Sequence, residues 1–334
     1  MDIEPFSLPL SDPLATAAGT IETRDGFVVR VTIDGTEGLG EATPLAGWTE
    51  PLDACRRALR GIEDPASAIE DEKLSETPAA RHGVSLAVLD ARARAACQPL
   101  YRYLGGTEHR ESVPVNATVG DGSPAETAAA AVTATTEGYR AIKLKVGART
   151  PAADIDRIFA VRERCPDVEL RLDANGAWSL DTATELVPRL ADLAVDVIEQ
   201  PLSAEELAGH ARLRGRGVEI AIDEGLFEHD PEEILSADAA DLLVCKPMAL
   251  GGIDRARRVV EAARSAGADA LITTTIDGAI ARAGAVHLAA SVSPVRPCGL
   301  ATAGMLGTDL REGIAPIENG SAVVPQGKGN IPCR

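Results

Sequence analysis

Three acidic residues, Asp173, Glu199 and Asp223, each end a short apolar segment and follow one another at nearly equal intervals. The ends of neighbouring parallel strands lie about 4.8 Å apart at one edge of a sheet, so carboxylates placed there would repel one another without a cation. Each acid taken alone could instead cap the helix that follows it. Three acids at nearly equally spaced strand ends favour a metal site over three separate helix caps. Hard oxygen ligands indicate Mg²⁺, with Mn²⁺ also possible.

Lysines accompany these acids in a chain that uses little lysine, since only five of its 33 lysine and arginine residues are lysines. Lys143 and Lys145 stand two positions apart in one apolar segment, which places both amines on one strand face about 7 Å apart. Lys246 ends another such segment, one interval after Asp223. A guanidinium does not lose its proton in the working range, so lysines at these positions indicate proton transfer. The alternative is that they are solvated strand ends.

A lysine must be uncharged to act as a base. We expect Lys143, Mg²⁺ and partial desolvation to lower the pKa of Lys145 toward the useful range. The proton next to a carboxylate is very weakly acidic, so the charge that develops on its removal needs a metal beside it. The residues therefore predict the removal of an α-proton from a small-molecule carboxylate.

The segments that carry these residues recur with the rhythm of a βα barrel. Eight short apolar runs are separated by helical stretches, and no Gly-rich phosphate loop of a doubly wound sheet follows the first of them. Before them, the sequence predicts a strand over Gly26–Ile33, an Asp34-Gly35 turn, and helices over 50–60 and 78–96. An Asn319-Gly320 turn near the end should bring the chain back to this first region. The eight predicted strands cover residues 113–119, 141–146, 169–174, 195–199, 219–223, 241–246, 269–275 and 296–300.

Composition excludes several classes of function. A net charge of -18 disfavours nucleic acid and anionic membranes as partners. No basic-then-apolar leader or membrane-length apolar run occurs, so we expect a soluble cytoplasmic protein, which could form a homo-oligomer. The six cysteines form no C-x-x-C pair and should be free thiols. The acid-rich, lysine-poor composition resembles that of proteins from salt-accumulating microbes, although a high-GC genome would also favour arginine over lysine.

Five motifs in this order resemble the enolase superfamily, in its muconate-lactonizing branch: Lys143-Leu144-Lys145, Asp173-Ala174-Asn175, Glu199-Gln200-Pro201, Asp223-Glu224 and Lys246-Pro247. The resemblance implies an α/β fold, a modified (β/α)7β TIM barrel with an α+β capping domain. The capping domain would comprise residues 1–105, the barrel 106–305, and a C-terminal return 306–334. The resemblance also implies that Asp173, Glu199 and Asp223 bind Mg²⁺. Lys145 would be the base, and Lys246 would lie on the opposite face of the substrate.

Within the branch, four stretches resemble o-succinylbenzoate synthases: Thr23–Gly26, Gly38–Trp48, Arg171 beside Asp173, and Thr273–Gly278. Members of that family dehydrate 2-succinyl-6-hydroxy-2,4-cyclohexadiene-1-carboxylate in menaquinone biosynthesis. In this reading Lys246 would stabilise the intermediate by its charge or by a cation–π contact with the substrate ring. The resemblance implies substrate contacts from Arg24, Thr274, Thr275 and Gly299, and supporting roles for Arg171, Asn175 and Glu224.

Other interpretations remain open. A racemase or epimerase of N-acylamino acids or dipeptides would use Lys145 and Lys246 on opposite faces, and the motifs also fit a cycloisomerase. A non-catalytic metal-binding barrel would need neither lysine. Elsewhere, we expect His287 to be a core residue, Asp277 to cap the helix over 279–291, and Trp178 to pack under the loop after the third barrel strand.

Overall fold

The computed structural model describes residues 1–16, 19–70 and 74–332. Its first part is an antiparallel sheet in the order β1-β2-β3, formed by β1 (Asp2–Thr16), β2 (Gly19–Ile33) and β3 (Thr36–Ala42). The predicted turn is present, with Asp34 and Gly35 both at positive φ. The sequence did not predict β1, whose prolines at positions 5, 9 and 13 are tolerated because it is an edge strand.

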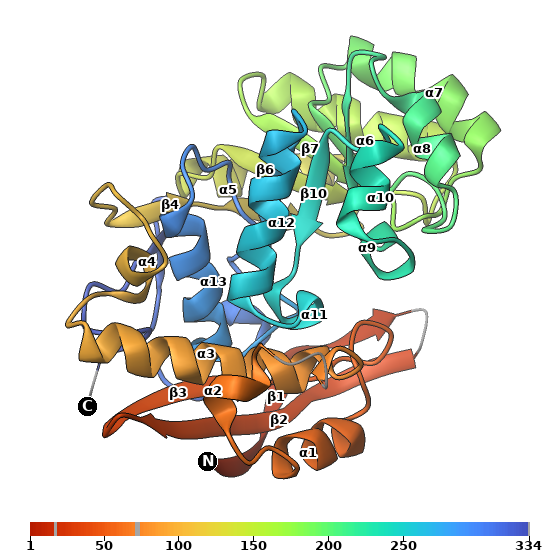
Figure 1. Ribbon diagram of the computed structural model, residues 1–334. Coiled ribbons are helices and arrows are strands. Elements are labelled where there is room, and N and C mark those ends of the chain that lie inside the picture. Colours follow the sequence, from red (N-terminus) through yellow and green to blue (C-terminus); the bar gives the residue numbers. More distant parts are fainter. Residues whose placement is uncertain (17–18, 71–73, 333–334) are drawn as a thin grey trace.

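Helix α3 (Pro78–Ala95) lies directly on this sheet (Figure 1). Two glycines of β3 permit the close approach, because a Cβ at Gly38 would lie 2.1 Å from the Ala87 carbonyl oxygen and one at Gly40 would lie 1.9 Å from that of Gly83. The predicted helix over 50–60 is α1 (Leu52–Arg60), and two short helices, α2 (Pro65–Ala68) and α4 (Leu100–Tyr103), complete the region. These elements form an α+β layer against one end of the barrel.

Seven parallel strands form the barrel sheet in chain order. They are β5 (Asn116–Val119), β6 (Ala141–Lys145), β7 (Glu169–Asp173), β8 (Val197–Glu199), β9 (Glu219–Ile222), β10 (Leu242–Cys245) and β11 (Asp269–Ile272). The helices around them are α5 (Pro124–Thr136), α6 (Pro151–Arg164), α7 (Leu180–Asp192), α8 (Leu207–Leu213), α9 (Gly225–Glu228), α10 (Pro231–Ser236), α11 (Pro247–Leu250), α12 (Ile253–Ser265) and α13 (Ala279–Ser291).

The predicted eighth strand, 296–300, is reduced to two isolated bridges that close the barrel. Cys298 pairs with Val115 and Gly299 pairs with Thr273, so residues 298–299 join the two edge strands. The predicted strand over 113–119 is likewise divided, and β4 (Ser112–Pro114) leaves the barrel to pair with β13 (Ser321–Val323). Pro114 has no N–H group with which to continue the barrel ladder, which accounts for the break.

The C-terminal hairpin of β12 (Ile317–Glu318) and β13 turns at Asn319 and Gly320, as predicted, but it packs on β4 beside the barrel. The segment after it reaches the first region. Leu100 N–H donates to the Gly329 carbonyl oxygen at 2.8 Å, and Arg94 donates to that of Ile331 at 2.8 Å. A short 3-10 helix, η2 (Ala303–Met305), precedes the hairpin.

The strand ends that carry the chemical residues face the capping layer. In Figure 1 the arrow of β10 points toward the antiparallel sheet, so the mouth of the barrel lies between the two regions. Below the mouth, five buried side chains fill the barrel interior: Val197, Ala221, Leu242, Val244 and Leu271. In the described part of the chain, no helix is long and apolar enough to cross a membrane.

Candidate active site

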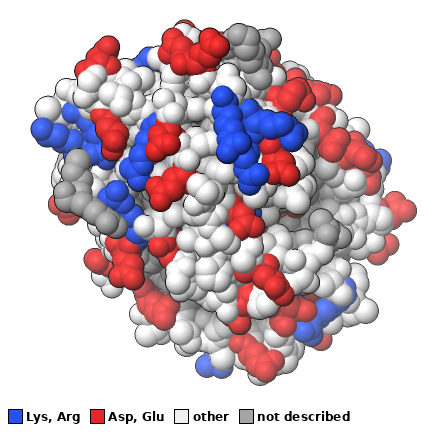
Figure 2. Space-filling view, turned by 90° about the horizontal axis from the view of Figure 1, so that it is seen from below, with Lys and Arg blue, Asp and Glu red and all other residues white. Residues whose placement is uncertain are grey.

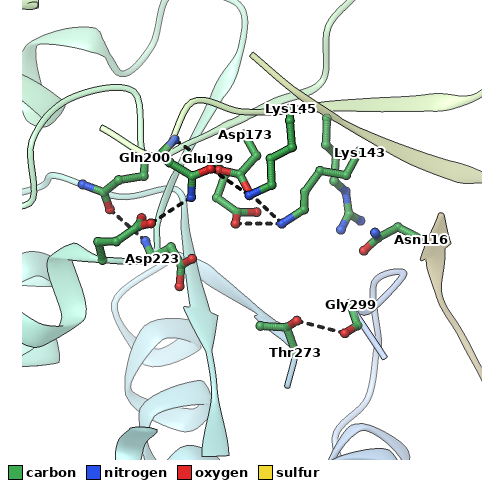
Figure 3. A network of polar contacts seen from close by, with 12 residues as sticks. Asn116, Lys143, Lys145, Asp173, Glu199, Gln200, Asp223, Thr273 and Gly299 are labelled. Carbon is green, nitrogen blue, oxygen red and sulfur yellow. Dashed lines mark hydrogen bonds and ion pairs between the residues drawn. The ribbon is translucent and has the colours of Figure 1, made fainter. Parts of the chain in front are cut away.

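Strand register brings the predicted lysines and acids together. Lys145 lies opposite Asp173 on β6 and β7, and Asp173 lies opposite Glu199 on β7 and β8. Asp223 follows β9 directly, and Lys246 follows β10 at the start of α11. Figure 3 shows Asp173 and Glu199 beside the two lysines of β6, and Asp223 on the other side of Glu199. Consecutive βα units therefore place all these side chains at one end of the barrel.

Three ammonium groups neutralise the three acids. Lys143 Nζ lies 2.9 Å from both Asp173 Oδ2 and Glu199 Oε1, and Lys145 Nζ lies 2.7 Å from Asp173 Oδ2. From the other side, Lys246 Nζ lies 2.6 Å from Asp223 Oδ2. The three acidic residues are at most 3% exposed. Lysines therefore approach the acid group from two sides, as a base and an opposing cation would.

The electrostatics of this group are strongly perturbed. Burial alone would lower the pKa of Lys143, but the negative charges of Glu199, Asp173 and Asp223 outweigh burial and raise it. Burial raises the pKa of Glu199 to about 7, and it also raises that of Asp223. The pKa of Asp173 falls because Lys143 and Lys145 together outweigh its burial. Shifts in both directions within one small group of side chains are typical of active sites.

The acids fit a divalent cation by their chemistry, although no metal cage is preformed. Among the described residues, no three acidic, histidine or cysteine side chains already lie in a metal-binding cluster. The lysine amines stand between the acids instead. One buried carboxylate oxygen, Asp223 Oδ1, has no hydrogen-bond partner in the described structure. A buried acceptor of this kind, beside two more carboxylates, is a suitable Mg²⁺ ligand.

The predicted supporting residues Asn175 and Glu224 lie beside Lys145. Asn175 Oδ1 accepts from Lys145 Nζ at 2.7 Å, and Asn175 Nδ2 donates to Glu224 Oε1 at 2.9 Å. Asn175 has φ of 44°, a left-handed conformation that asparagine tolerates better than most residues. This conformation turns its side chain back toward the base.

Gln200 has a positioning role that the sequence reasoning missed. It has φ of 41°, and its Oε1 accepts from the backbone N–H groups of Asp223 at 3.0 Å and Gly225 at 3.1 Å. The side chain therefore fixes the backbone that carries Asp223. Its place after Glu199 in the Glu-Gln-Pro motif was the only sequence signal.

Arg171, for which the resemblance implies a supporting role, contacts residues other than Lys145. It pairs with Lys143 in the strand register, two residues before the level of Lys145. Its Nε donates to Glu169 Oε1 at 2.8 Å, and its Nη1 donates to the Pro297 carbonyl oxygen at 2.7 Å. These contacts lead toward the closing segment of the barrel, away from the mouth. They tie β7 to that segment.

Arg24, predicted to contact substrate, is buried and engaged with backbone carbonyl oxygens. Its three guanidinium nitrogens donate to the carbonyls of Ile276 at 3.2 Å, Pro44 at 3.0 Å and Thr43 at 2.9 Å. The side chain is only 2% exposed. Arg24 therefore joins the capping layer to the loop after β11, and its contribution is structural in this conformation.

The loop after β11 is internally bonded. Thr275 Oγ1 donates to Asp277 Oδ1 at 2.5 Å, and the hydroxyls of Thr274 and Thr302 lie 2.9 Å apart. The prediction that Asp277 caps α13 is wrong, because the N-cap residue is Gly278 and the Asp277 carboxylate is turned back to Thr275.

Gly299 belongs to the barrel closure, where its carbonyl oxygen accepts from Thr273 Oγ1 at 2.9 Å. A Cβ at Gly299 would lie 2.4 Å from that hydroxyl. Figure 3 shows Thr273 and Gly299 across the mouth from the lysines. The residue is a glycine because the two segments approach closely, which is a structural reason.

Trp48 is the second residue that sequence reasoning did not assign to the site. The Lys246 Nζ atom lies 3.3 Å from the centre of the Trp48 ring, and this ring meets Phe227 of α9 edge-on at 4.5 Å between centroids. The tryptophan comes from the loop after β3. The capping layer therefore contributes an aromatic wall to the active site.

His287 is a core residue, as predicted. It is fully buried, its Nε2 lies 2.7 Å from the Asn330 carbonyl oxygen, and Tyr101 N–H donates to its Nδ1 at 3.2 Å. Trp178 is also buried, within the main hydrophobic core. Five of the cysteines are free thiols, and Cys333 lies outside the described residues.

Comparisons with known proteins agree with this geometry. Residues 126–330 match the family described as enolase C-terminal domain-like, and residues 2–91 match the one described as MenC, N-terminal domain. An L-Ala-D/L-Glu epimerase from Bacillus subtilis strain 168 is 31% identical over 98% of this chain and 93% of its own length. An N-succinylamino acid racemase from Thermus thermophilus is 31% identical over 97% and 91%. A chloromuconate cycloisomerase from Pseudomonas sp. strain P51 is 28% identical over 98% and 95%.

Solved structures show the same similarity. The substrate-liganded L-Ala-D/L-Glu epimerase from Bacillus subtilis has a TM-score of 0.88 at 30% identity, covering 98% of this chain and 96% of that one. A dipeptide epimerase from Enterococcus faecalis V583, complexed with Mg and the dipeptide L-Leu-L-Tyr, also has a TM-score of 0.88, at 28% identity over 98% and 97%. This architecture is therefore shared with a relative that was solved with Mg and a dipeptide bound.

Proposed function

Because this chain belongs to the enolase superfamily, in its muconate-lactonizing branch, we propose that it is an o-succinylbenzoate synthase. It would convert 2-succinyl-6-hydroxy-2,4-cyclohexadiene-1-carboxylate to o-succinylbenzoate and water, a step of menaquinone biosynthesis. The match of residues 2–91 to the MenC N-terminal domain supports this member of the branch. The site must then provide one base and a means of stabilising the negative charge that forms.

The observation that carries the proposal is the asymmetry of the two lysines. The Lys145 side chain is 43% exposed, whereas that of Lys246 is 13% exposed and lies against the Trp48 ring. A cation against an aromatic face is stabilised in its charged form. Lys246 is therefore suited to electrostatic stabilisation, and Lys145 is the accessible base. A reaction with one base matches this arrangement better than a reaction with two.

In this reaction, Lys145 removes the proton α to the ring carboxylate, and the electron pair enters an enediolate. Collapse of the enediolate expels the ring hydroxyl on the same face, and the Lys145 ammonium returns the proton so that water leaves. Asn175 holds the Lys145 amine in place through the bond at 2.7 Å. Asp173, Glu199 and Asp223 would hold Mg²⁺, which supplies positive charge at the substrate carboxylate when bound. Because the product ring is aromatic, the elimination is downhill.

N-succinylamino acid racemisation is the second candidate, since lysines approach the acids from two sides and a 31% identical relative has that name. Free dipeptides fit less well. Their ammonium group requires a carboxylate. Residues Gly299–Thr302, which contact Thr273 and Thr274 of the predicted substrate loop, supply only a glycine, two apolar residues and a hydroxyl. Asp277, in the adjacent loop, is buried and bonded to Thr275. A succinyl carboxylate would suit the hydroxyls of Thr275 and Thr302 better than an ammonium group would.

Two assays on the purified protein test the proposal. With Mg²⁺ present, we expect the ultraviolet absorbance of the aromatic product to rise with the synthase substrate, and EDTA to stop the rise. In a parallel assay, proton NMR in D₂O follows exchange at the α-carbon of N-succinylamino acids. Exchange with loss of chirality, without any synthase turnover, would replace the proposal with the racemase.

A further inference from the structure

The loop between β11 and α13 contains a strained residue. Ile276 has φ of 62°, a conformation that a β-branched side chain rarely adopts. Strain of this kind persists only where surrounding contacts over-determine it, and it concentrates at functional sites. The contacts that hold this loop therefore identify residues that organise the mouth of the barrel.

The capping layer supplies two of these contacts. Arg24 Nε donates to the Ile276 carbonyl oxygen at 3.2 Å. The Ile276 side chain packs with Leu8 of β1 and with Leu306. These contacts fix the strained peptide from outside the barrel.

Glu41 supplies the third contact. This glutamate belongs to β3, is fully buried, and accepts from the backbone N–H groups of Gly278 at 2.7 Å and Ala281 at 2.9 Å. Gly278 has no side chain that could cap α13, so a carboxylate from another region of the chain caps the positive end of this helix. Thr43 Oγ1 donates to the same carboxylate at 2.6 Å. Three donors thus converge on Glu41.

The loop is anchored at both of its ends. At the β11 end, Thr273 N–H donates to the Cys245 carbonyl oxygen at 3.0 Å, next to Lys246. At the α13 end, Glu41 holds Gly278. Thr274 and Thr275, for which the resemblance to the synthases implies substrate contacts, lie between these two anchors. Asp309 also holds this end, since it accepts from the Ala279 N–H at 2.7 Å. A change at Glu41 would therefore loosen one end of the segment without touching the lysines or the acids of the site.

We propose that Glu41 is a positioning residue through which the capping layer fixes residues 274–277 in the conformation that receives the substrate. The identity of that substrate rests on the proposed function. The mechanical role of Glu41 does not, because it follows from contacts within the protein. The identity of the substrate and the mechanical role of Glu41 can therefore be tested separately.

The principal test compares Glu41→Gln with Glu50→Gln. Glutamine keeps the volume of the side chain, but its amide group would face one of the N–H donors, so one capping bond is lost. Glu50 is a matched control, because it is also a buried glutamate and accepts from two backbone N–H groups at the start of α3, those of Ala79 at 3.0 Å and Ala80 at 2.9 Å. Neither of these two bonds involves residues 273–281.

Amide hydrogen exchange and steady-state kinetics are the two measurements. In Glu41→Gln, exchange over residues 274–281 should accelerate about tenfold, and KM should rise about tenfold while kcat stays within about twofold, as expected for about one lost hydrogen bond. In Glu50→Gln, the exchange of these residues should not change, even if the protein melts at a lower temperature. Equal behaviour of the two variants in the exchange of residues 274–281 would overturn the proposal.

A second variant covers the case in which Glu41→Gln does not fold. A Cβ at Gly278 would lie 3.0 Å from both Glu41 carboxylate oxygens and 2.9 Å from Leu310 Cδ1, so Gly278→Ala disturbs the same contact from the barrel side. Faster exchange of residues 274–281 in this variant supports the proposal, and unchanged exchange contradicts it. If the wild-type protein lacks synthase turnover, the proposed function fails, but the exchange comparison still decides the role of Glu41.

Discussion

The Lys246 ammonium lies 3.3 Å from the centre of the Trp48 ring, although the two residues come from different regions of the chain. The same ammonium pairs with Asp223 at 2.6 Å. Lys246 is therefore held between a carboxylate of the barrel and an aromatic ring of the capping layer. This arrangement couples the position of the capping loop to the charge at the back of the active site.

Removing the ring should release Lys246. A largely desolvated cation–π contact contributes about 2 kcal/mol, so Trp48→Ala should lower kcat/KM of the dehydration at least about tenfold. Trp48→Phe keeps an aromatic face and should retain most of the activity. The ultraviolet product assay measures both variants. Equal losses of kcat/KM in Trp48→Phe and Trp48→Ala would contradict this, because they would show that activity depends on the volume of the indole and not on the contact between Lys246 and an aromatic ring.

Metal removal should separate activity from folding. Because lysines already neutralise the three acids, EDTA should abolish turnover yet leave the circular dichroism spectrum unchanged. Saturating Mg²⁺ should then raise the melting temperature, with a stabilisation of about 2.7 kcal/mol at a hundred times the dissociation constant.

Asp223→Asn should lose this Mg²⁺-dependent gain, whereas Asp181→Asn, at an exposed position on α7, should keep it. A gain of equal size in both variants would place the metal elsewhere.

Glu41 should contribute to the pH dependence of stability. Burial, assisted by the nearby charge of Asp277, raises its pKa to about 7 from the ordinary 4.5. The folded protein therefore binds this proton more tightly than the unfolded chain does. The resulting stabilisation is complete below pH 4.5 and is lost as pH rises from 4.5 to 7, by on the order of 3 kcal/mol.

Urea unfolding of the wild type and of Glu41→Gln across this range gives the measurement. The difference in unfolding free energy between the two proteins should decrease with rising pH. A difference that does not vary with pH would show that Glu41 does not titrate there.

Salt should stabilise the fold. The net charge is -18, and Figure 2 shows acidic side chains spread over the face seen from below, with basic ones in fewer groups. Screening shortens the range of this repulsion from about 10 Å at 0.1 M to about 3 Å at 1 M. We expect the melting temperature to rise by roughly 5 °C over that interval of KCl. Choline chloride should act equally if screening alone is responsible, and an unchanged melting temperature would contradict the prediction.

The sequence predicted what depends on local periodicity. Lys143, Lys145, Asp173 and Glu199 could be placed because a strand alternates faces and neighbouring strand ends meet, and the structure brings these residues together. Contacts between distant segments could not be placed in this way. Trp48 and Glu41 act across the boundary between the capping layer and the barrel, for which the sequence contains no periodic signal.

Two wrong expectations have the same origin. Asp277 stands where an N-cap usually stands, but Glu41 already occupies the end of α13, and Asp277 is left to Thr275. Residues 296–300 stand where the rhythm of the barrel predicts a strand, but Pro297 and Gly299 weaken the ladder, and the segment pairs with Val115 and Thr273 through two isolated bridges. In both places a partner remote in sequence decided the local structure.

The central claim is that one lysine, Lys145, performs the proton transfer while Lys246 acts through its charge. Solvent deuterium incorporation at the α-carbon, measured in Lys145→Ala and Lys246→Ala with the synthase substrate or a non-eliminating analogue, tests this claim most directly. Lys145→Ala should lose exchange by a factor of about 10³ or more, whereas Lys246→Ala should exchange slowly but measurably on the same face. Exchange that persists in Lys145→Ala and disappears in Lys246→Ala would contradict it.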